Sequence, residues 1–322
     1  MSPQAQDGLR VALAQISPVW LDRSATLQKI MGCVSQAADE GADLVTFGEA
    51  LLPGYPFWVE RTGGARFNDE RQKNFYALYL DQGVVIERGD LAPLCDLARQ
   101  KKIAVYLGIM ERAPDRGGHT LYASIVYISP EGIVGSVHRK LQPTYDERLV
   151  WGPSDGHGLR VHPLGNFTVG GLNCWENWLP LARASLYGQG EDLHVSIWPG
   201  GLHNTQDLPV FIAKEARSYV IAVSGLMRKT DIPDDFPHAD EIAANAGDFM
   251  ANGASCIAAP DGSWVIEPVI GEEALLIADI DQAQVRRERQ NLDVVGHYSR
   301  PDVTRLMVNR ERQSTVQFKD QD

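Results

Sequence analysis

The sequence predicts an α/β layered fold with mixed sheets and helices on the outer faces. Short apolar runs typical of strands recur from one end of the chain to the other. Segments with helical spacing alternate with many of them, which favours stacked layers over a helical bundle or a sandwich of bare sheets. No linker or break in composition divides the 322 residues, so we expect a single domain spanning residues 1–322.

The predicted strands are short apolar segments, most of them bounded by residues that favour turns. They are Arg10–Ile16, Asp43–Phe47, Ile103–Ile109, Ala123–Ile128, Ile133–Val137, Phe167–Leu172, Leu193–Ile197, Tyr219–Ser224, Ala254–Ala258, Ser263–Glu267 and Ala274–Ile280. The turn at residues 129–132 is too short to hold a crossover helix, so the strands on either side form a hairpin. Hairpins among strand–helix units predict a mixed sheet.

Helices are predicted where apolar residues recur on one face. The clearest begins with Ser24 as N-cap, places Leu27, Ile30 and Val34 on one face, and ends at Gly41. Further helices are predicted at Asp90–Lys102, Asn177–Tyr187 and Pro209–Arg217.

Two long segments, Pro56–Gln72 and Lys229–Gly247, are predicted as surface insertions. Loops of this length are uncommon unless they bind something or are disordered. From about residue 303 the chain becomes polar, and we expect a flexible tail there.

Composition excludes several classes of protein. The net charge of −12, without a basic tract, argues against a nucleic-acid partner. No apolar stretch reaches the length of a membrane span, and the first residues lack the apolar core of a secretion signal. The four cysteines lie far apart without a C-x-x-C pair, which argues against a structural metal site. We therefore expect free thiols in a reducing, cytoplasmic setting.

Cys174 is the most informative residue of the chain. It follows the predicted strand Phe167–Leu172 and directly precedes a predicted helix. The positive end of a helix dipole favours a thiolate over a thiol, so Cys174 is a candidate nucleophile. A small buried apolar residue is the alternative, and it is the usual role of a single cysteine.

Two more reactive groups follow predicted strands directly. Glu49 comes after Asp43–Phe47, and Lys140 comes after Ile133–Val137. A fourth group, Glu147, follows Lys140 after a short loop that contains a proline. Because sites in α/β sheets gather at the carboxyl ends of strands, we expect these groups to meet in one pocket with the thiol.

Each of these groups also has a simpler interpretation. Glu49 could cap a helix, Lys140 beside Arg139 could form a solvated basic corner, and Glu147 could belong to an exposed ion pair with Arg148. Glu176 could complement the N-terminus of its helix, or otherwise line the pocket.

The sequence around the three strand ends consists of short motifs in a fixed order. They are Gly48–Ala50 with Pro53–Pro56, then His138–Arg148, then Gly171–Asn177. Together they resemble the glutamate, lysine and cysteine motifs of the nitrilase superfamily, and more narrowly of the true nitrilases. The resemblance runs from Val11 to Asp302, nearly the whole chain.

This resemblance implies a four-layer αββα sandwich with helices on its outer faces, no cofactor and no metal. It implies hydrolysis of an organic nitrile by water to a carboxylic acid and ammonia, through a covalent thioimidate and an acyl-enzyme. Cys174 would be the nucleophile, Glu49 the general base, Lys140 the group that stabilises charge and Glu147 a positioning residue. It also implies a homodimer or larger homo-oligomer, with Asn177–Tyr187 and Pro209–Arg217 at the interface.

Substrate binding is expected to involve Tyr55, Trp175 and Trp198. Aromatic residues that could line the pocket are Tyr55, Phe57, Trp58, Trp151, Trp178 and Trp198, and we expect at least half of these to belong to the core. If several do line it, aryl or arylaliphatic nitriles would fit better than small aliphatic ones.

Other functions remain as alternatives. An amidase or carbamoyl-hydrolase of the same superfamily would use the same residues on C(=O)–N bonds. A cysteine protease would need an imidazole partner, for which His138 is the candidate. A serine hydrolase and a nucleotide-binding protein are disfavoured because neither G-x-S-x-G nor a phosphate-binding glycine motif is present. A non-catalytic assembly module is the alternative from a different class.

Overall fold

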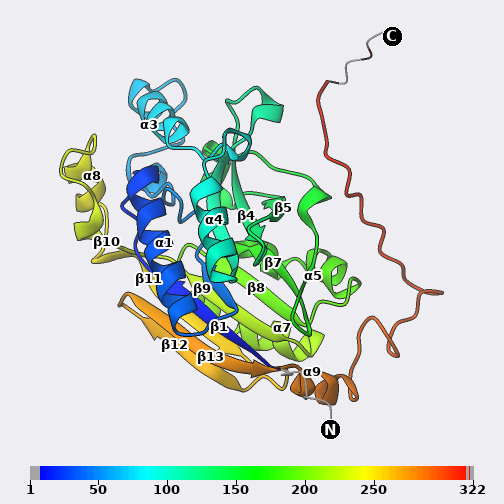
Figure 1. Ribbon diagram of the computed structural model, residues 1–322. Coiled ribbons are helices and arrows are strands. Elements are labelled where there is room, and N and C mark those ends of the chain that lie inside the picture. The colour runs from blue at the N-terminus through cyan, green and yellow to red at the C-terminus, as the bar shows by residue number, and fades with distance from the viewer. Residues whose placement is uncertain (1–7, 317–318, 320–322) are drawn as a thin grey trace.

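The computed structural model describes residues 8–316 and residue 319, and it consists of two mixed β-sheets packed face to face with helices on their outer sides (Figure 1). The first sheet has six strands in the order β13-β1-β2-β3-β4-β5. These strands are β1 (Gly8–Gln15), β2 (Leu44–Phe47), β3 (Ala104–Arg112), β4 (Leu121–Ile128), β5 (Val134–Arg139) and β13 (Ala274–Asp281). β1, β2 and β3 run parallel, and the remaining pairings are antiparallel.

The second sheet has seven strands and repeats this plan. Its order is β10-β11-β9-β8-β7-β6, with β12 also paired to β11. Its strands are β6 (His162–Leu164), β7 (Phe167–Asn173), β8 (Leu193–Trp198), β9 (Tyr219–Ser224), β10 (Leu226–Arg228), β11 (Phe249–Ala258) and β12 (Trp264–Ile270). β7, β8 and β9 run parallel, as β1, β2 and β3 do in the first sheet.

Helices cover the outer face of each sheet. The α-helices are α1 (Arg23–Asp39), α2 (Trp58–Arg61), α3 (Glu70–Asp81), α4 (Ala92–Lys101), α5 (Pro180–Tyr187), α6 (Leu202–Thr205), α7 (Leu208–Ala216), α8 (Ala239–Ala244) and α9 (Gln282–Arg289). α1 and α4 lie side by side over the first sheet (Figure 1), and α5 and α7 pack on the second. The predicted αββα sandwich is therefore the observed fold.

Three apolar layers hold the sandwich together. The central layer joins both sheets and includes Val11, Tyr106, Val195 and Ile221. A second layer lies between the first sheet and the helices α1 and α4, and the third lies under α5 and α7. Burial of this apolar surface at about 25 cal/mol per Å² is what fixes the two sheets against each other.

The predicted strands all occur, with boundaries shifted by a few residues, and the structure adds β6 and β10. The predicted N-cap of the first helix is wrong. Asp22, not Ser24, caps α1 by accepting a hydrogen bond from the backbone N–H of Ala25, because Asp22 alone has the extended backbone that precedes the first turn.

The two predicted surface insertions are not simple surface loops. The first contains α2 and the start of α3, with Phe57 and Trp58 buried, and the second contains α8. They pack on each other, since Arg71 forms an ion pair with Glu241 at 2.7 Å and α2 contacts α8. Both segments therefore belong to one structural unit above the sheets.

Beyond α9 the described part of the chain contains no further helix or strand. Arg312 forms an ion pair with Asp155 at 3.0 Å, and the backbone N–H of Gln313 donates to the same carboxylate at 2.9 Å. Among the described residues, no helix is both apolar and long enough to cross a bilayer.

Candidate active site

Glu49 lies just past the end of β2 and is fully buried. Its backbone N–H donates to the carbonyl of Trp198 at 3.0 Å, which joins the end of β2 to the end of β8 in the other sheet. Ala50, the next residue, has φ 47°, a conformation that turns the chain sharply away from the strand. The carboxylate is thereby directed between the two sheets rather than along a helix or toward the surface.

Lys140 directly follows β5, and its ammonium lies between two carboxylates. Nζ donates to Oε1 of Glu49 at 2.8 Å and to Oε2 of Glu147 at 2.7 Å, and all three side chains are buried. The basic corner considered for Lys140 and Arg139 does not form. Arg139 is also buried, where its guanidinium pairs with Glu111 at 2.7 Å.

Glu147 is held by a short 3₁₀ helix, Tyr145–Leu149. The backbone N–H of Thr144 donates to its Oε2 at 2.6 Å, and the hydroxyl of Tyr55 donates to its Oε1 at 2.7 Å. The exposed ion pair with Arg148 is absent, because Glu147 is buried and the Arg148 Nε donates to the carbonyl of Pro143. Each oxygen of Glu147 is therefore already bonded.

Cys174 directly follows β7 and has φ 48°, in the left-handed region that a non-glycine residue rarely adopts. Such a conformation costs on the order of 1–3 kcal/mol and recurs at functional sites. A single 3₁₀ turn, Cys174–Trp178, follows, and α5 begins only at Pro180. The continuous helix expected here is wrong, since Leu179 adopts an extended conformation and separates the two helices.

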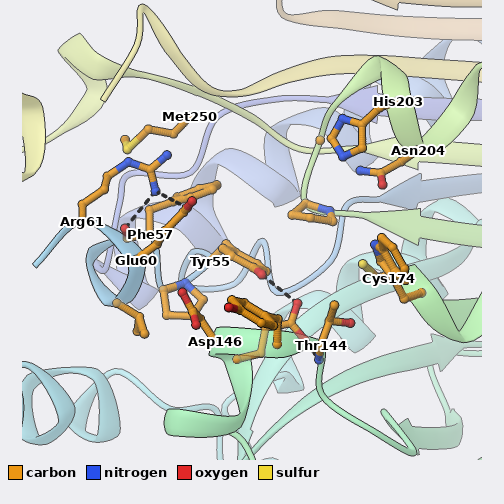
Figure 2. A pocket seen from close by; sticks show the side chains of 17 residues that line it. Tyr55, Phe57, Glu60, Arg61, Thr144, Asp146, Cys174, His203, Asn204 and Met250 are labelled. Atoms are coloured by element: carbon orange, nitrogen blue, oxygen red, sulfur yellow. Dashed lines mark hydrogen bonds and ion pairs between the residues drawn. The ribbon is translucent and has the colours of Figure 1, made fainter. Parts of the chain in front are cut away.

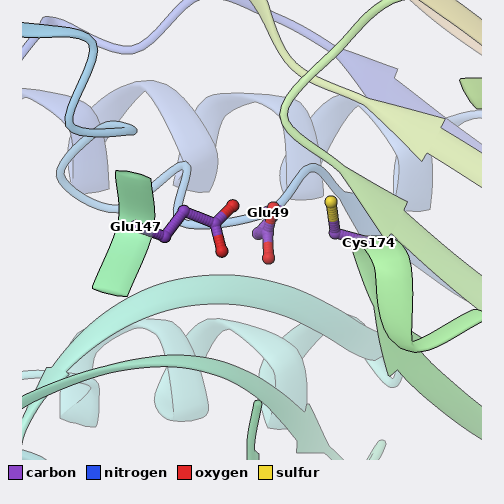
Figure 3. A group of neighbouring side chains, drawn as sticks. All are labelled: Glu49, Glu147 and Cys174. Atoms are coloured by element: carbon purple, nitrogen blue, oxygen red, sulfur yellow. The ribbon is translucent and has the colours of Figure 1, made fainter. Parts of the chain in front are cut away.

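The sulfur of Cys174 and the two carboxylates converge in the folded chain (Figure 3). One atom from each of Glu49, Glu147 and Cys174 lies within 4.8 Å of the others, and Lys140 bonds to both carboxylates. The fold therefore brings together the four groups that the sequence leaves far apart.

Burial dominates the ionisation of this cluster. It raises the pKa of Glu49 to about 7, with the Lys140 ammonium opposing the rise and the Glu147 carboxylate adding to it. Burial alone would lower the pKa of Lys140, but the surrounding Cys174, Glu49 and Glu147 raise it well above its ordinary value. Lys140 is thus a fixed positive charge.

The expected thiolate is not favoured by this environment. Burial, followed by the Glu49 carboxylate, raises the pKa of Cys174 well above its ordinary value, while Lys140 and the backbone N–H of Trp175 oppose the rise. The helix dipole expected to favour a thiolate is weak here, because only one 3₁₀ turn follows the cysteine. The resting site therefore contains a neutral thiol beside a carboxylate that can accept its proton.

Two carboxylates and a thiol could in principle hold a metal ion. Here the Lys140 ammonium is within 2.8 Å of both carboxylates, so a positive charge already occupies the place of a cation. A second cation would face direct repulsion at this distance. The donor set fits an ammonium group better than a metal.

A cavity of about 370 Å³ opens above the sulfur (Figure 2). Tyr55 and Trp175, two of the residues expected to bind substrate, line it. Trp198, the third, is fully buried in the core beside Cys174 and is not among the lining residues. Of the other aromatic candidates, Phe57 lines the cavity, Trp58 and Trp151 lie in the core, and Trp178 is exposed on the outer surface.

Several residues of the cavity wall were not identified from the sequence. They are Pro56, Val59, Glu60, Arg61, Thr144, Tyr145, Asp146, Pro199, Gly200, His203, Asn204 and Met250. Residues 56–61 belong to the first predicted insertion, whose unusual length already indicated a binding role. Met250 lies in β11 and the others belong to turns and short helices, and neither spacing nor composition marks these residues as belonging to a pocket.

His138 is not a partner of the thiol. It is buried, and its Nε2 lies 3.1 Å from both carboxylate oxygens of Glu176. This arrangement removes the structural basis of a Cys-His protease. Glu176 itself caps the 3₁₀ turn after Cys174, in keeping with its expected place at a helix N-terminus, and it does not line the cavity.

Comparison with known proteins places this geometry in a family. Residues 10–290 match the model of the carbon-nitrogen hydrolase family. The chain is 36% identical to Nitrilase 2 of an unknown prokaryotic organism over 313 residues, covering 97% of this chain and 96% of the relative. It is 32% identical to Nitrilase 1 of Arabidopsis thaliana over 315 residues, covering 96% and 89% of the two chains.

Solved structures share the fold. An amidase from Nesterenkonia sp. AN1 superimposes with a TM-score of 0.63 at 18% sequence identity, covering 90% of this chain and 97% of the amidase. At this level of identity the likeness concerns the architecture alone.

Proposed function

Because this chain belongs to the carbon-nitrogen hydrolase family, we propose that it is a nitrilase, which converts an organic nitrile and two waters into a carboxylic acid and ammonia. The observation that carries the proposal is the buried contact of Lys140 with Glu49 and Glu147 beside the Cys174 thiol. A nitrile carbon is a poor electrophile and requires a strong nucleophile, which a deprotonated cysteine supplies.

The first half of the reaction forms a covalent intermediate. Glu49 accepts the thiol proton as the sulfur of Cys174 bonds to the nitrile carbon, and the proton passes to the nitrile nitrogen to give a thioimidate. Lys140 stabilises the negative charge that develops on nitrogen. The backbone N–H of Trp175, which faces the sulfur, is placed to serve as a second donor.

The second half releases both products. Glu49 takes a proton from a water that adds to the thioimidate carbon and passes it to the nitrogen. The second proton of that water reaches the nitrogen as the added hydroxyl becomes a carbonyl, the C–N bond breaks, ammonia leaves and a thioester remains. A second water then attacks the thioester, which releases the acid and returns the proton to the sulfur. Glu147 keeps Lys140 in place through both steps, because its own oxygens are fixed by Thr144 and Tyr55.

The test is ammonia release from a panel of nitriles and their matched amides, with Cys174→Ala as the control. We expect ammonia and the corresponding acid from nitriles, and no turnover by the control. Ammonia from the amides alone would instead establish an amidase. Detection of the covalent acyl intermediate on another cysteine would overturn the assignment of Cys174 as the nucleophile.

We also propose that the protein forms a homodimer through α5 and α7. Leu181 of α5 and Phe211 of α7 are exposed, and so are Trp178 at the end of the 3₁₀ turn and Leu179 just before α5. Surface of this kind on a soluble enzyme is typical of a subunit interface. We place the enzyme in the cytoplasm, since its four cysteines are free and its chemistry requires a reduced thiol.

A further inference from the structure

The side chain of Glu176 bonds to the backbone on both sides of the proposed catalytic groups. Its Oε1 accepts from the N–H of Leu141 at 2.6 Å, and its Oε2 accepts from the N–H of Asn173 at 2.9 Å. Leu141 directly follows Lys140, and Asn173 directly precedes Cys174. One fully buried carboxylate therefore joins the two chain segments that carry the ammonium and the thiol.

The strands that carry Lys140 and Cys174 belong to different sheets. β5 is the edge strand of the first sheet, β7 lies in the second, and no ladder joins the two sheets among the described strands. Backbone pairing therefore fixes each segment within its own sheet but not against the other. Glu176 provides a direct polar connection across that gap.

A second contact keeps this carboxylate in place. Nε2 of His138, near the end of β5, lies 3.1 Å from both oxygens of Glu176. Burial acts to raise the pKa of Glu176, but His138 and the backbone N–H groups of Leu141 and Asn173 outweigh it and hold the pKa below its ordinary value. The carboxylate stays ionised and so accepts from both backbone segments at once.

We propose that Glu176 is a positioning residue that sets the distance between Lys140 and Cys174 by tying Leu141, just past the end of β5, to Asn173 at the end of β7. The proposal rests on the nitrile hydrolysis proposed above. Glu176 contacts neither the cavity nor the reacting atoms, so it acts only through the placement of these two groups.

The decisive variant is Glu176→Gln, which keeps the shape of the side chain. A glutamine amide has one oxygen and one NH₂ group, so it faces one of the two backbone N–H groups with a donor and loses that bond. We expect kcat/KM per folded molecule to fall by about ten- to a hundredfold, the range that a misplacement of about 1 Å can produce. The fall should lie in kcat rather than in KM, because the cavity wall is unchanged.

A change in the pH profile separates positioning from simple loss of stability. Lys140 lowers the pKa of Glu49, so moving Lys140 away from Glu49 should shift the acidic limb of kcat/KM to higher pH. The rate at which iodoacetamide alkylates Cys174, followed by peptide mass spectrometry, should show the same shift. This second measurement needs no nitrile, so it tests Glu176 even if the proposed reaction is wrong.

Glu111→Gln is the matched control. Glu111 is a buried carboxylate of β3, in the first sheet. It accepts hydrogen bonds from the Arg139 guanidinium at 2.7 Å and from the Ser124 hydroxyl at 2.7 Å. It makes no bond to the backbone beside Lys140 or Cys174, so its loss should lower the melting temperature while the rate per folded molecule and the acidic limb stay at the parent values.

The proposal fails if folded Glu176→Gln turns over at the parent rate with an unmoved acidic limb. It also fails if Glu111→Gln gives the same fall in rate and the same shift, because the effect would then be general destabilisation. Should Glu176→Gln not fold, Glu176→Asp retains the charge on a side chain one methylene shorter, which cannot reach both N–H groups. The same loss of rate and shift of the limb are expected from it, and parent behaviour would overturn the proposal.

Discussion

Single side chains at this site have pKa values well above their ordinary values in water. Glu49 is a carboxylate with a raised pKa, Cys174 is a neutral thiol, and Lys140 is permanently charged between two acids. Each state follows from burial combined with the charge of the neighbours. The proposed reaction would therefore begin with a proton transfer within the cluster rather than with a preformed thiolate.

This ionisation predicts the acidic limb of the pH profile. As the proposed base, Glu49 acts only when ionised, and burial raises its pKa from 4.5 to about 7, so kcat/KM should be half-maximal near pH 7, rise above it and fall below it. The loss should approach tenfold per pH unit at lower pH. The measurement is kcat/KM of the parent protein against pH, and a limb near 4.5 would show that burial does not control this carboxyl.

Loss of the Lys140 charge should be severe. Lys140→Gln removes the ammonium donor aimed at the developing negative charge. One such donor typically lowers the activation free energy by about 2.7–4 kcal/mol, so kcat should fall about a hundred- to a thousandfold. Steady-state kinetics on a nitrile measure this. Lys101→Gln, which removes a surface ammonium paired with Asp39, is the control and should keep the parent rate. Equal rates for both variants would exclude the proposed role.

The Tyr55 hydroxyl should matter through Glu147. Tyr55→Phe keeps the ring in the cavity wall but leaves Oε1 of Glu147 without its 2.7 Å donor. A hydrogen bond to a charged group contributes about 1.5–3 kcal/mol, so kcat should fall about tenfold or more. Tyr79→Phe, which removes a buried hydroxyl bonded to the Gly54 carbonyl, is the control. A rise in KM with kcat unchanged would instead indicate that the Tyr55 hydroxyl contacts only substrate.

At the scale of elements, close approach of the strands sets where Glu49 lies. β3 passes so near the end of β2 that a Cβ at Gly108 would lie 2.1 Å from the Gly48 carbonyl oxygen and 2.7 Å from Cα of Glu49. Only glycine fits at that point of β3. The ends of β2 and β8 also lie close together, since the backbone N–H of Glu49 donates to the carbonyl of Trp198.

Gly108→Ala should therefore displace Glu49 and lower both stability and rate. We expect a loss of stability of about 1–3 kcal/mol from overpacking, and a fall in kcat beyond the loss of folded protein. Thermal denaturation and kinetics measure the two effects. Gly32→Ala in α1, where a Cβ meets nothing within 4 Å, is the control; it should gain about 0.5–1 kcal/mol and keep the parent rate.

In the whole molecule, the proposed catalytic groups lie at the junction of two sheets, and the proposed subunit interface lies just outside it. The 3₁₀ turn after Cys174 leads directly into α5, whose apolar residues are exposed. An interface on α5 and α7 would thus cover the segment that follows the nucleophile.

Leu181→Lys should disrupt this interface. A charge in the centre of an apolar contact is costly to bury, so light scattering should give half the parent mass while the melting transition of the subunit remains. Phe67→Lys, at an exposed apolar position far from α5, is the control and should keep the parent mass. A parent protein that is monomeric at working concentration would contradict the proposed dimer.

The sequence alone determined the layers and the candidates. Apolar periodicity predicted the strands and the main helices, because burial of one face depends on local spacing. The positions of Glu49, Lys140 and Cys174 directly after predicted strands led to the expectation of one shared pocket, and the chemistry was implied by the resemblance of the motifs around them. The resemblance to nitrilases followed from the same motifs.

The arrangement of these groups depends on the folded chain. In the structure, Lys140 lies between two carboxylates and Trp198 lies outside the cavity wall. Burial raises the pKa of Cys174 so that its thiol is neutral, and Glu176 bonds to the backbone beside Lys140 and beside Cys174. None of these follows from local spacing, because burial, charge and hydrogen bonding at this site depend on residues that are distant in the chain. Distances of a few ångströms between two separate sheets are set by packing, and packing is a property of the whole fold.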